Sequence, residues 1–188
     1  MKIGLTQRVL THKGRAYDSI EHGWYSYLQE YTLTYIPNRL DQDFEDIALR
    51  LDALIITGGD DSALRRNIEL KIATQMMLQK KPILGVCHGC FLLQDVLGGT
   101  IIEIDNHMDT EHLISYFGEM ITVNSYHNLA IKQVHQRGTV LCIDQDQNCE
   151  AWIDSNLAGV AWHPERMETP WLPEEIKNLL FKLSLIHI

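Results

Sequence analysis

The stretch ILGVCHGCFLLQDVLGG (residues 83–99) joins a short, fully apolar run to a longer segment with helical spacing. It predicts a buried strand that turns sharply at Cys87 into a helix, which a pair of glycines ends. Two patterns overlap at this turn. Gly85-x-Cys87-x-Gly89 has the spacing of a nucleophile elbow, whereas Cys87-x-x-Cys90 has the spacing of a redox dithiol. Cys87 is therefore a candidate for a hydrolytic nucleophile or for half of a disulfide couple.

The elbow interpretation has a mechanical basis. Glycines two residues on either side of Cys87 let the strand and helix backbones pass closely. The helix N-terminus directs free N–H groups toward the thiol, which favours the thiolate and makes the His88 N–H an oxyanion donor. A redox pair also favours a helix N-terminus but does not require both glycines. A zinc site is disfavoured because Cys142 and Cys149 do not repeat the Cys-x-x-Cys spacing.

Strand-like and helical segments alternate along the first hundred residues. A first strand at 2–7 is followed by a polar loop at 7–15, and helical spacing then begins at Asp18. Further strands are predicted at 31–38, 53–57 and 83–87, with helices near 44–51, 63–79 and 88–97. Such alternation predicts an α/β fold, a three-layer sandwich with a mostly parallel central sheet.

The second half of the chain has a different character. Short strand-like runs separated by turn residues predict a mixed sheet with hairpins, and a last helix is expected over about 173–185. The total length fits a single domain over residues 1–188. The strand-like runs lie at 99–104, 120–127, 129–134, 139–144, 149–153 and 158–165.

Composition excludes several classes of protein. The 188 residues are 45% hydrophobic and 22% charged, as in ordinary globular proteins, and the net charge is −9. This acidic balance argues against nucleic acid as a partner, because nucleic-acid binders carry basic stripes. No membrane partner is expected, since no apolar segment has spanning length and the N-terminus lacks a signal-peptide core. Four cysteines do not make a disulfide framework here, so a cytoplasmic location is expected.

A base for a thiol nucleophile is offered by GVAWHPERM (residues 159–167). His163 follows an apolar strand that Pro164 ends, and Glu165 lies two residues further on. On an extended backbone this spacing puts His163 and Glu165 on the same side, where the carboxylate holds the imidazole in one tautomer. The alternative is a solvent-facing histidine at a strand end.

A second glycine pair supplies candidate oxyanion donors. ITGGDD (residues 56–61) ends a strand with Gly58 and Gly59, and glycine permits the positive φ that turns an N–H toward a bound anion. An ordinary β-turn is the alternative interpretation.

Together these segments resemble class I glutamine amidotransferase-like proteins. GVCHGC is similar to the family's nucleophile elbow, GVAWHPE to its GVQWHPE segment and ITGGDD to its oxyanion loop. VNSYHNLAI (residues 123–131) resembles a signature of the γ-glutamyl hydrolase branch, peptidase family C26. The resemblance extends over nearly the whole chain and implies the flavodoxin-like fold of the class I glutamine amidotransferases.

The resemblance also implies an activity and a site. The expected reaction is hydrolysis of a γ-glutamyl amide bond through a γ-glutamyl thioester, with no cofactor and no metal. Two departures from the family pattern are Phe91, where many members have glutamine, and Asn128-Leu129 in the branch signature. The implied residues are the triad Cys87, His163 and Glu165, the oxyanion donors Gly59 and His88, and the substrate-binding residues Gly58, Ser125, Tyr126 and His127.

The leaving group is the least constrained part of the prediction. The expected partner is a small γ-glutamyl substrate, and no oligomeric state is predicted. MKIGLTQRV (residues 1–9) resembles short members of the branch, which implies γ-glutamyl-CDP-amidate, hydrolysed to CDP-amidate and glutamate in capsule phosphoramidate synthesis, as one candidate. Arg8 and Arg15 are expected to contact such a leaving group, with Lys13, Arg65 and Arg66 as further candidates. A solvated surface is the alternative for each of these cations.

Besides hydrolysis of a γ-glutamyl substrate by the chain alone, three other functions are considered. The chain is interpreted either as a stand-alone γ-glutamyl hydrolase or as a glutaminase subunit that delivers ammonia to a partner synthetase. A dithiol oxidoreductase would use Cys87 and Cys90 together. A non-enzymatic binding protein is disfavoured because Cys87, His163 and Glu165 are all present.

Overall fold

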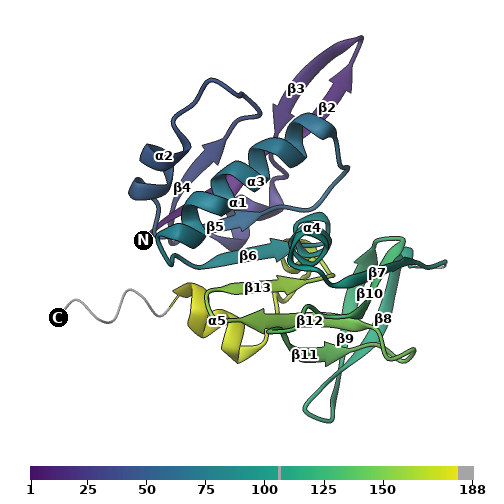
Figure 1. The fold of residues 1–188 in the computed structure, drawn as a ribbon. Helices are drawn as coiled ribbons and strands as arrows, with labels where there is room; N and C mark the ends of the chain where they lie inside the picture. The colour runs from purple at the N-terminus through teal and green to yellow at the C-terminus, as the bar shows by residue number, and fades with distance from the viewer. Residues whose placement is uncertain (106, 182–188) are drawn as a thin grey trace.

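The computed structural model describes residues 1–105 and 107–181. Most of its strands form one eleven-stranded sheet, and two more form a separate hairpin (Figure 1). The strands are β1 (Lys2–Thr6), β2 (Arg8–His12), β3 (Arg15–Ser19), β4 (Thr32–Ile36), β5 (Ala53–Ile56), β6 (Ile83–Val86), β7 (Thr100–Glu103), β8 (Met108–Tyr116), β9 (Glu119–Tyr126), β10 (Leu129–Gln133), β11 (Thr139–Ile143), β12 (Cys149–Asp154) and β13 (Leu157–Val160). The helices are α1 (Gly23–Tyr27), α2 (Phe44–Arg50), α3 (Ala63–Leu78), α4 (His88–Leu97) and α5 (Glu174–Phe181), with a 3₁₀ turn η1 (Pro164–Arg166).

The sheet has a parallel half and an antiparallel half. Its main order is β4-β1-β5-β6-β13-β12-β11-β8-β9, while β10 branches from β12 and pairs with β7. Strands β4, β1, β5, β6 and β13 are parallel to their neighbours within this half, and the pairs beyond β13 are antiparallel. The predicted α/β class and the mixed second half are confirmed.

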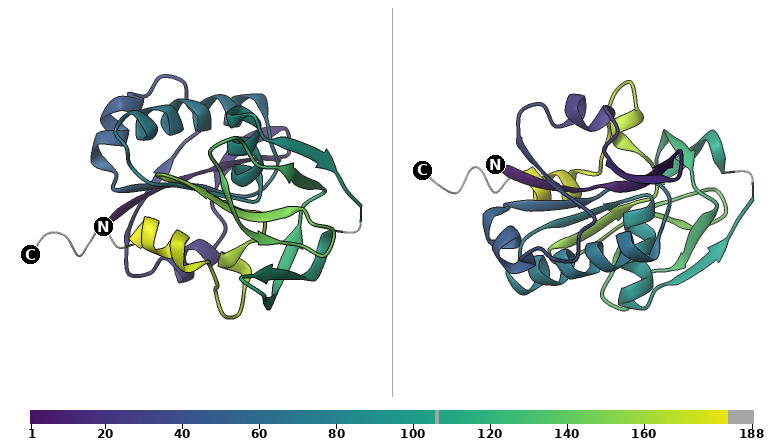
Figure 2. Two further views of the ribbon diagram at one scale, coloured as in Figure 1. Left: turned by 60° about the horizontal axis from the view of Figure 1, so that its bottom comes forward. Right: turned by 90° about the horizontal axis from the view of Figure 1, so that it is seen from above.

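Helices cover both faces of the parallel half (Figure 2). Helices α2, α3 and α4 lie on one face, while α1 and α5 lie on the other. Helices are needed on both faces of the sheet because all four residues of β5, which point alternately to the two faces, are fully buried. Ile55 packs in the core with α1 and α5, whereas Leu54 and Ile56 pack in the core with α2 and α3. Three layers result, as the alternating pattern predicts.

The turn from β6 into α4 depends on two close backbone contacts. A Cβ atom at Gly85 would lie 2.4 Å from the carbonyl carbon and oxygen of Gly89. A Cβ atom at Gly89 would lie 2.2 Å from the carbonyl oxygen of Ile56 in β5. The glycines flanking Cys87 are therefore required by the approach of helix to sheet, which confirms the mechanical reason given for the elbow. Helix α4 ends at Gly98, whose φ of 90° is the expected left-handed cap.

The expected loop at 7–15 is wrong, and the helix expected from Asp18 begins only at Gly23. Strands β2 and β3 form an antiparallel hairpin, and Asp18 pairs with Val9 inside it. The two-residue connection Lys13-Gly14 has φ values of 49° and 72°, as a tight primed turn requires. Between β3 and β4, helical structure is confined to the short α1. Alternating side chains around a Lys-Gly pair were the signal that the loop interpretation overlooked.

Two other differences concern the second half. Strand β8 was not predicted, although it forms a long antiparallel pair with β9. The last helix, expected to reach about residue 185, is α5, and residues 182–188 of the expected tail lie outside the described part. Across residues 1–105 and 107–181, none of the helices combines the length and apolar character that crossing a membrane requires.

Enlarging Gly89 tests the backbone contact on which the elbow depends. We expect Gly89→Ala to lower the free energy of unfolding by about 3 kcal/mol, because a carbonyl of the central sheet cannot move aside. Urea unfolding monitored by circular dichroism measures the loss. The matched control is Gly14→Ala in the hairpin turn, where no atom lies within 4 Å of the new Cβ. Only the positive φ opposes that change, so about 1 kcal/mol is expected, and equal losses at both sites would contradict the steric explanation.

Candidate active site

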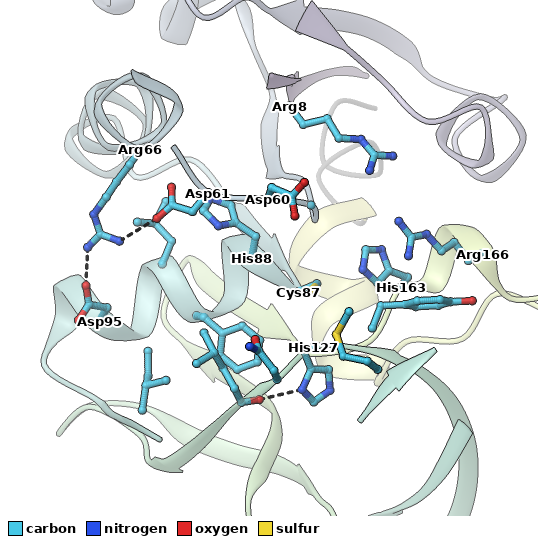
Figure 3. Close-up of a pocket in the computed structure, with 18 residues that line it drawn as sticks. Arg8, Asp60, Asp61, Arg66, Cys87, His88, Asp95, His127, His163 and Arg166 are labelled. Carbon is cyan, nitrogen blue, oxygen red and sulfur yellow. Dashed lines mark hydrogen bonds and ion pairs between the residues drawn. The ribbon is translucent and has the colours of Figure 1, made fainter. Parts of the chain in front are cut away.

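The C-terminal ends of β5, β6 and β13 meet at one edge of the sheet, beside a cavity of about 750 Å³ (Figure 3). Ligands of parallel α/β sheets bind at such an edge, outside the carboxyl ends of the strands. Cys87, His88, Gly59 and His163 all line this cavity. The three motifs that were predicted to cooperate therefore lie together, although they are far apart in the sequence.

Cys87 occupies a strained backbone conformation at the start of α4. Its φ is 48° and its ψ is −105°, values that a residue with a side chain rarely adopts. The Cys87 N–H donates to the carbonyl of Val160 at 2.9 Å, which ties the turn to the neighbouring strand β13. The residue is 7% exposed, and its side chain borders the cavity. This is the geometry of a nucleophile elbow.

His163 and Glu165 form a buried pair beside Cys87. The Nδ1 atom of His163 lies 2.7 Å from Oε1 of Glu165, and both side chains are nearly inaccessible to solvent. An extended backbone was expected between them from the sequence. Instead, Pro164 begins the 3₁₀ turn η1. A Cβ atom at Gly58 would lie 2.3 Å from the His163 ring, so glycine there makes room for the imidazole.

The protonation of His163 is set by two neighbours. Burial alone would lower its pKa, yet interactions with Cys87 and Glu165 outweigh burial and raise the pKa to about 9. A charged imidazole is therefore stable at neutral pH. An imidazolium beside a cysteine and a carboxylate is the charge arrangement of an activated thiol.

Asn124 fixes the backbone of His163, a contact that the sequence analysis missed. Its side-chain amide donates to the His163 carbonyl at 2.8 Å, and its Oδ1 accepts the His163 N–H at 2.8 Å. Asn124 itself is buried in β9. One side chain thus satisfies both backbone groups of His163 and joins the antiparallel half of the sheet to the site.

A buried network of charged side chains supports the loop at Gly58 and Gly59, on the other side of Cys87 from His163. Arg65 is fully buried and donates to the Asp60 and Gly58 carbonyls at 3.0 and 3.3 Å. It also pairs with Glu69 at 2.8 Å, and Glu69 lies 2.7 Å from Nε2 of His88. Burial would raise the pKa of Glu69, but His88 and Arg65 lower it. Arg65 is therefore part of the scaffold rather than a contact for a leaving group.

The predicted substrate-binding residues divide into two groups. Tyr126 and His127 line the cavity, together with Phe91 at 5.5 Å from the His127 ring. Ser125 does not, because its hydroxyl donates to the carbonyl of His107 at 2.5 Å and its side chain is buried. Gly58 is not among the residues that line the cavity either, and it lies against the His163 ring.

His127 has a defined tautomer when neutral. Its Nδ1–H donates to the carbonyl of Leu129 at 2.7 Å, which leaves Nε2 as the free nitrogen. Burial lowers the pKa of His127 and favours this neutral form. Among the described residues no hydrogen-bond partner is found for Nε2 of His127, which faces Glu150 at 3.9 Å. No group of histidine, cysteine, aspartate or glutamate suited to a metal ion occurs in the parts of the chain at 1–105 and 107–181.

The predicted cationic residues are distributed unevenly. Arg8 and Arg66 line the cavity, whereas Lys13 and Arg15 lie in the exposed part of the hairpin and do not. Arg66 is paired with Asp95 and lies 3.9 Å from Asp61. Arg166, which was not predicted, also lines the cavity.

The remaining cysteines lie in the core. Cys90 is fully buried and accepts a hydrogen bond from the Trp152 indole at 3.3 Å, and burial raises its pKa well above the ordinary value. Burial likewise raises the pKa of Cys142 to about 12. None of the four cysteines is in a disulfide. Cys90 is thus a buried residue of the elbow helix, and its burial disfavours a redox couple with Cys87.

Comparisons with known proteins agree with this geometry. γ-Glutamyl-CDP-amidate hydrolase from Campylobacter jejuni is 27% identical over 182 residues, which cover 88% of this chain and 90% of the relative. A subunit of the glutamine-hydrolysing GMP synthase from Methanopyrus kandleri is 27% identical over 179 residues, covering 84% and 92%. The crystal structure of a glutamine amidotransferase from Thermotoga maritima superposes with a TM-score of 0.67 at 13% identity, over 87% of this chain and 76% of that one.

The structural likeness shows that the fold is shared. Family membership rests on sequence, because the model of the family described as glutamine amidotransferase class-I matches residues 15–183. That match includes each of the three motifs around Cys87. The chain therefore belongs to the class-I glutamine amidotransferase family.

Proposed function

We propose that this chain is a cysteine-dependent hydrolase that cleaves a γ-glutamyl amide bond and releases L-glutamate together with an amine or amidate. One observation carries the proposal. Cys87, on a strained turn at a helix N-terminus, lies at the same cavity as His163, whose Nδ1 is 2.7 Å from the buried Glu165 carboxylate. Nucleophile, base and orienting acid in this order form a hydrolytic triad.

In the first half of the reaction, Sγ of Cys87 attacks the γ-carbonyl carbon. A C–S bond forms, and the C–N bond breaks as His163 gives its proton to the leaving nitrogen. A His163 pKa of about 9 keeps that proton available at neutral pH. The product of this half is a γ-glutamyl thioester on Cys87.

In the second half, water hydrolyses the thioester. Cys87 is acylated at this stage, so one of the two neighbours that raise the His163 pKa no longer acts on it. The imidazole, which has already given its proton to the leaving nitrogen, stays neutral and accepts a proton from the attacking water. Glu165 holds the ring in one tautomer through both halves, and the Cys87–His163 pair is regenerated when glutamate leaves.

Backbone N–H groups on two sides of Cys87 are suited to stabilise the oxyanion. Gly59 has a φ of 110°, which only glycine adopts without strain. The N–H of His88 is in the first turn of α4 and has no partner within that helix. The Arg65–Glu69–His88 network holds both segments in place, so the donors are preorganised before the charge develops.

The glutamyl group is proposed to occupy the side of the cavity formed by His127 and Phe91, while Tyr126 lies against His163 at the boundary with the other side. His127 borders this side with its ring, because its Nδ1–H donates to the Leu129 carbonyl and its buried Nε2 faces Glu150. Phe91 stands where many family members have glutamine, so this part of the pocket is apolar. Such a pocket favours the aliphatic part of a glutamyl chain.

The leaving group proposed from the Campylobacter jejuni relative is a cytidine diphosphoramidate, because that relative is named for γ-glutamyl-CDP-amidate. A second candidate function is supported by the Methanopyrus kandleri relative, which is part of a GMP synthase. In that case the chain would hydrolyse glutamine and pass ammonia to a partner. Weak glutamine hydrolysis that rises sharply when a synthetase is added would identify the second function.

Replacing each cysteine of the Cys-x-x-Cys pair separates hydrolysis from redox chemistry. We expect Cys87→Ala to abolish glutamate release from a panel of glutamine, γ-glutamyl-4-aminobutyrate, γ-glutamyl peptides and γ-glutamyl-CDP-amidate. Cys90→Ala should stay within about threefold of the wild type, because Cys90 only packs in the core. Enzymatic determination of glutamate ranks both variants and substrates. Equal loss in both variants, with dithiol oxidoreductase activity in the wild type, would sink the hydrolase proposal.

The pKa of His163 is expected to depend on both neighbours. Cys87→Ser and Glu165→Gln each remove an interaction that raises it, so each should lower the His163 pKa by roughly one unit or more. NMR titration of the histidine ring signals measures the change, with His163→Gln used to assign the resonance. Cys90→Ala is the control and should leave the titration unchanged. A wild-type His163 that titrates at the ordinary value would contradict the proposed effect of Cys87 and Glu165 on its pKa.

Glu165 is expected to act on turnover through the orientation of His163. Glu165→Gln should lower kcat by about 100-fold or more while KM changes less than about threefold, because the wrong tautomer impairs proton transfer and leaves binding intact. Steady-state kinetics on the best substrate of the panel measures both constants. Glu168→Gln, an exposed neighbour on the same segment, is the control. A rise in KM at constant kcat would instead assign Glu165 to substrate binding.

A further inference from the structure

Two arginines at the cavity share one carboxylate. Glu21, which follows the hairpin, accepts from Nη2 of Arg8 at 2.8 Å and from Nη2 of Arg166 at 2.7 Å. Arg166 makes a second contact through Nε at 2.9 Å, so its guanidinium is held as a fork. We call Arg8, Glu21 and Arg166 the arginine clamp. Its residues come from β2, from the segment before α1, and from η1.

The clamp is placed by contacts with the site itself. The Arg8 side chain packs over Gly59, where an added Cβ would lie 3.0 Å from its Cδ. The Arg166 guanidinium stacks on the Tyr126 ring at 4.5 Å, and that ring packs edge-on against His163 at 5.5 Å. Figure 3 shows both arginines on the His163 side of Cys87, away from His127.

This side of the cavity is the one that a leaving group would occupy. His163 is the proposed donor of a proton to the leaving nitrogen, so the leaving group must extend past His163. Arg166 is three residues further along the chain and lies against Tyr126, the neighbour of His163. The glutamyl group is proposed for the opposite side, near His127 and Phe91.

The clamp carries more positive than negative charge. Two guanidiniums face a single carboxylate, and the side chains of Arg8, Arg166 and Glu21 are only 25%, 21% and 30% exposed. Glu21 holds the guanidiniums in place but leaves donors free, since in the described part of the chain no acceptor is found for Nη1 of Arg8 or of Arg166. The other acids that line the cavity do not form ion pairs with Arg8 or Arg166 among the described residues. Asp95 and Asp61 pair with Arg66, and Asp60 is exposed without an ion pair within the described residues.

We propose that Arg8 and Arg166, positioned by Glu21, bind a phosphoryl group of the leaving group and make the enzyme selective for γ-glutamyl amidates of phosphorylated compounds. This inference rests on the proposed hydrolase function. A diphosphate fits better than a carboxylate because it offers more acceptor oxygens and more negative charge, so that it can accept from the free donors of both guanidiniums while Glu21 stays in place. Glu21 acts as a positioning residue that keeps both forks directed at the same space.

The test compares substrates that differ only in the leaving group. γ-Glutamyl-CDP-amidate carries a diphosphate, γ-glutamyl-p-nitroanilide a neutral amine and γ-glutamyl-4-aminobutyrate a carboxylate. Arg8→Gln and Arg166→Gln should each lower kcat/KM on the diphosphate substrate about 30-fold or more, mainly through KM, and change the other two by less than about threefold. Arg166→Lys should fall between wild type and Arg166→Gln because it keeps the charge and loses the fork. Arg50→Gln, an exposed arginine of α2, is the matched control.

Three kinetic results would overturn the inference. Equal losses on all three substrates would show that the clamp only maintains the structure. An equal loss on the carboxylate and diphosphate substrates would remove the selectivity for phosphoryl groups. No loss on the diphosphate substrate would place its binding elsewhere. For Glu21→Gln, a rise in KM on the diphosphate substrate at nearly constant kcat is expected, and unchanged constants would remove its positioning role.

A binding measurement separates this inference from the proposed function. CDP is the probe, titrated calorimetrically into the Cys87→Ala variant with and without Arg166→Gln. We expect Arg166→Gln to weaken CDP binding about tenfold or more. If wild type releases no glutamate from any substrate while CDP binding still depends on Arg166, the hydrolase function fails and the phosphoryl site stands. Glutamate release is also informative in the opposite case. If glutamate is released but neither CDP binding nor the selectivity among the three substrates changes when the arginines are replaced, the clamp inference is wrong and the hydrolase function stands.

Discussion

The contact between the first turn of α4 and the sheet is the constraint on which the site depends. With a Cβ atom excluded at Gly85 and Gly89, the helix approaches β5 and β6 closely enough that the connecting residue has no relaxed conformation available. Cys87 accommodates this close approach of helix to sheet by adopting a φ of 48°. The same approach brings the helix N-terminus to the edge of the sheet. Strain in one residue and an electrostatically favourable position for its sulfur are therefore two results of one packing requirement.

Buried charges on both sides of Cys87 convert this turn into a defined site. His163 with Glu165 lies on one side, and Arg65 with Glu69 and His88 lies on the other. Buried ion pairs add little net stability, but removal of one partner leaves an uncompensated charge in the interior. These networks therefore specify geometry more than they stabilise the fold. They hold loops whose own backbones would not keep a fixed position.

Much of this arrangement was predictable from local patterns. The elbow, the strand before His163 and the glycine pair at Gly58 are each visible in a few consecutive residues, and their order implied a parallel sheet. The hairpin β2–β3 was missed because the polar residues 7–15 were interpreted as a loop, although Lys13-Gly14 carried the turn signal. The contacts of Asn124 and Arg166 were beyond local pattern. They join residues 39 and 145 positions apart, and only the three-dimensional arrangement brings such residues together.

The bond between Glu21 and Arg166 has a consequence for the order in which the protein assembles during synthesis. It closes a loop of 145 positions, and the backbone of Gly23 lies against that of Glu165 so closely that a Cβ atom would be 2.4 Å away. Closing a loop of that size opposes association by about 4 kcal/mol, so the contact forms late. A nascent chain that has completed β6 and α4 already holds its thiol but still lacks the imidazole and carboxylate. The proposed triad is then complete only after β13 and η1 have joined the sheet, late in synthesis.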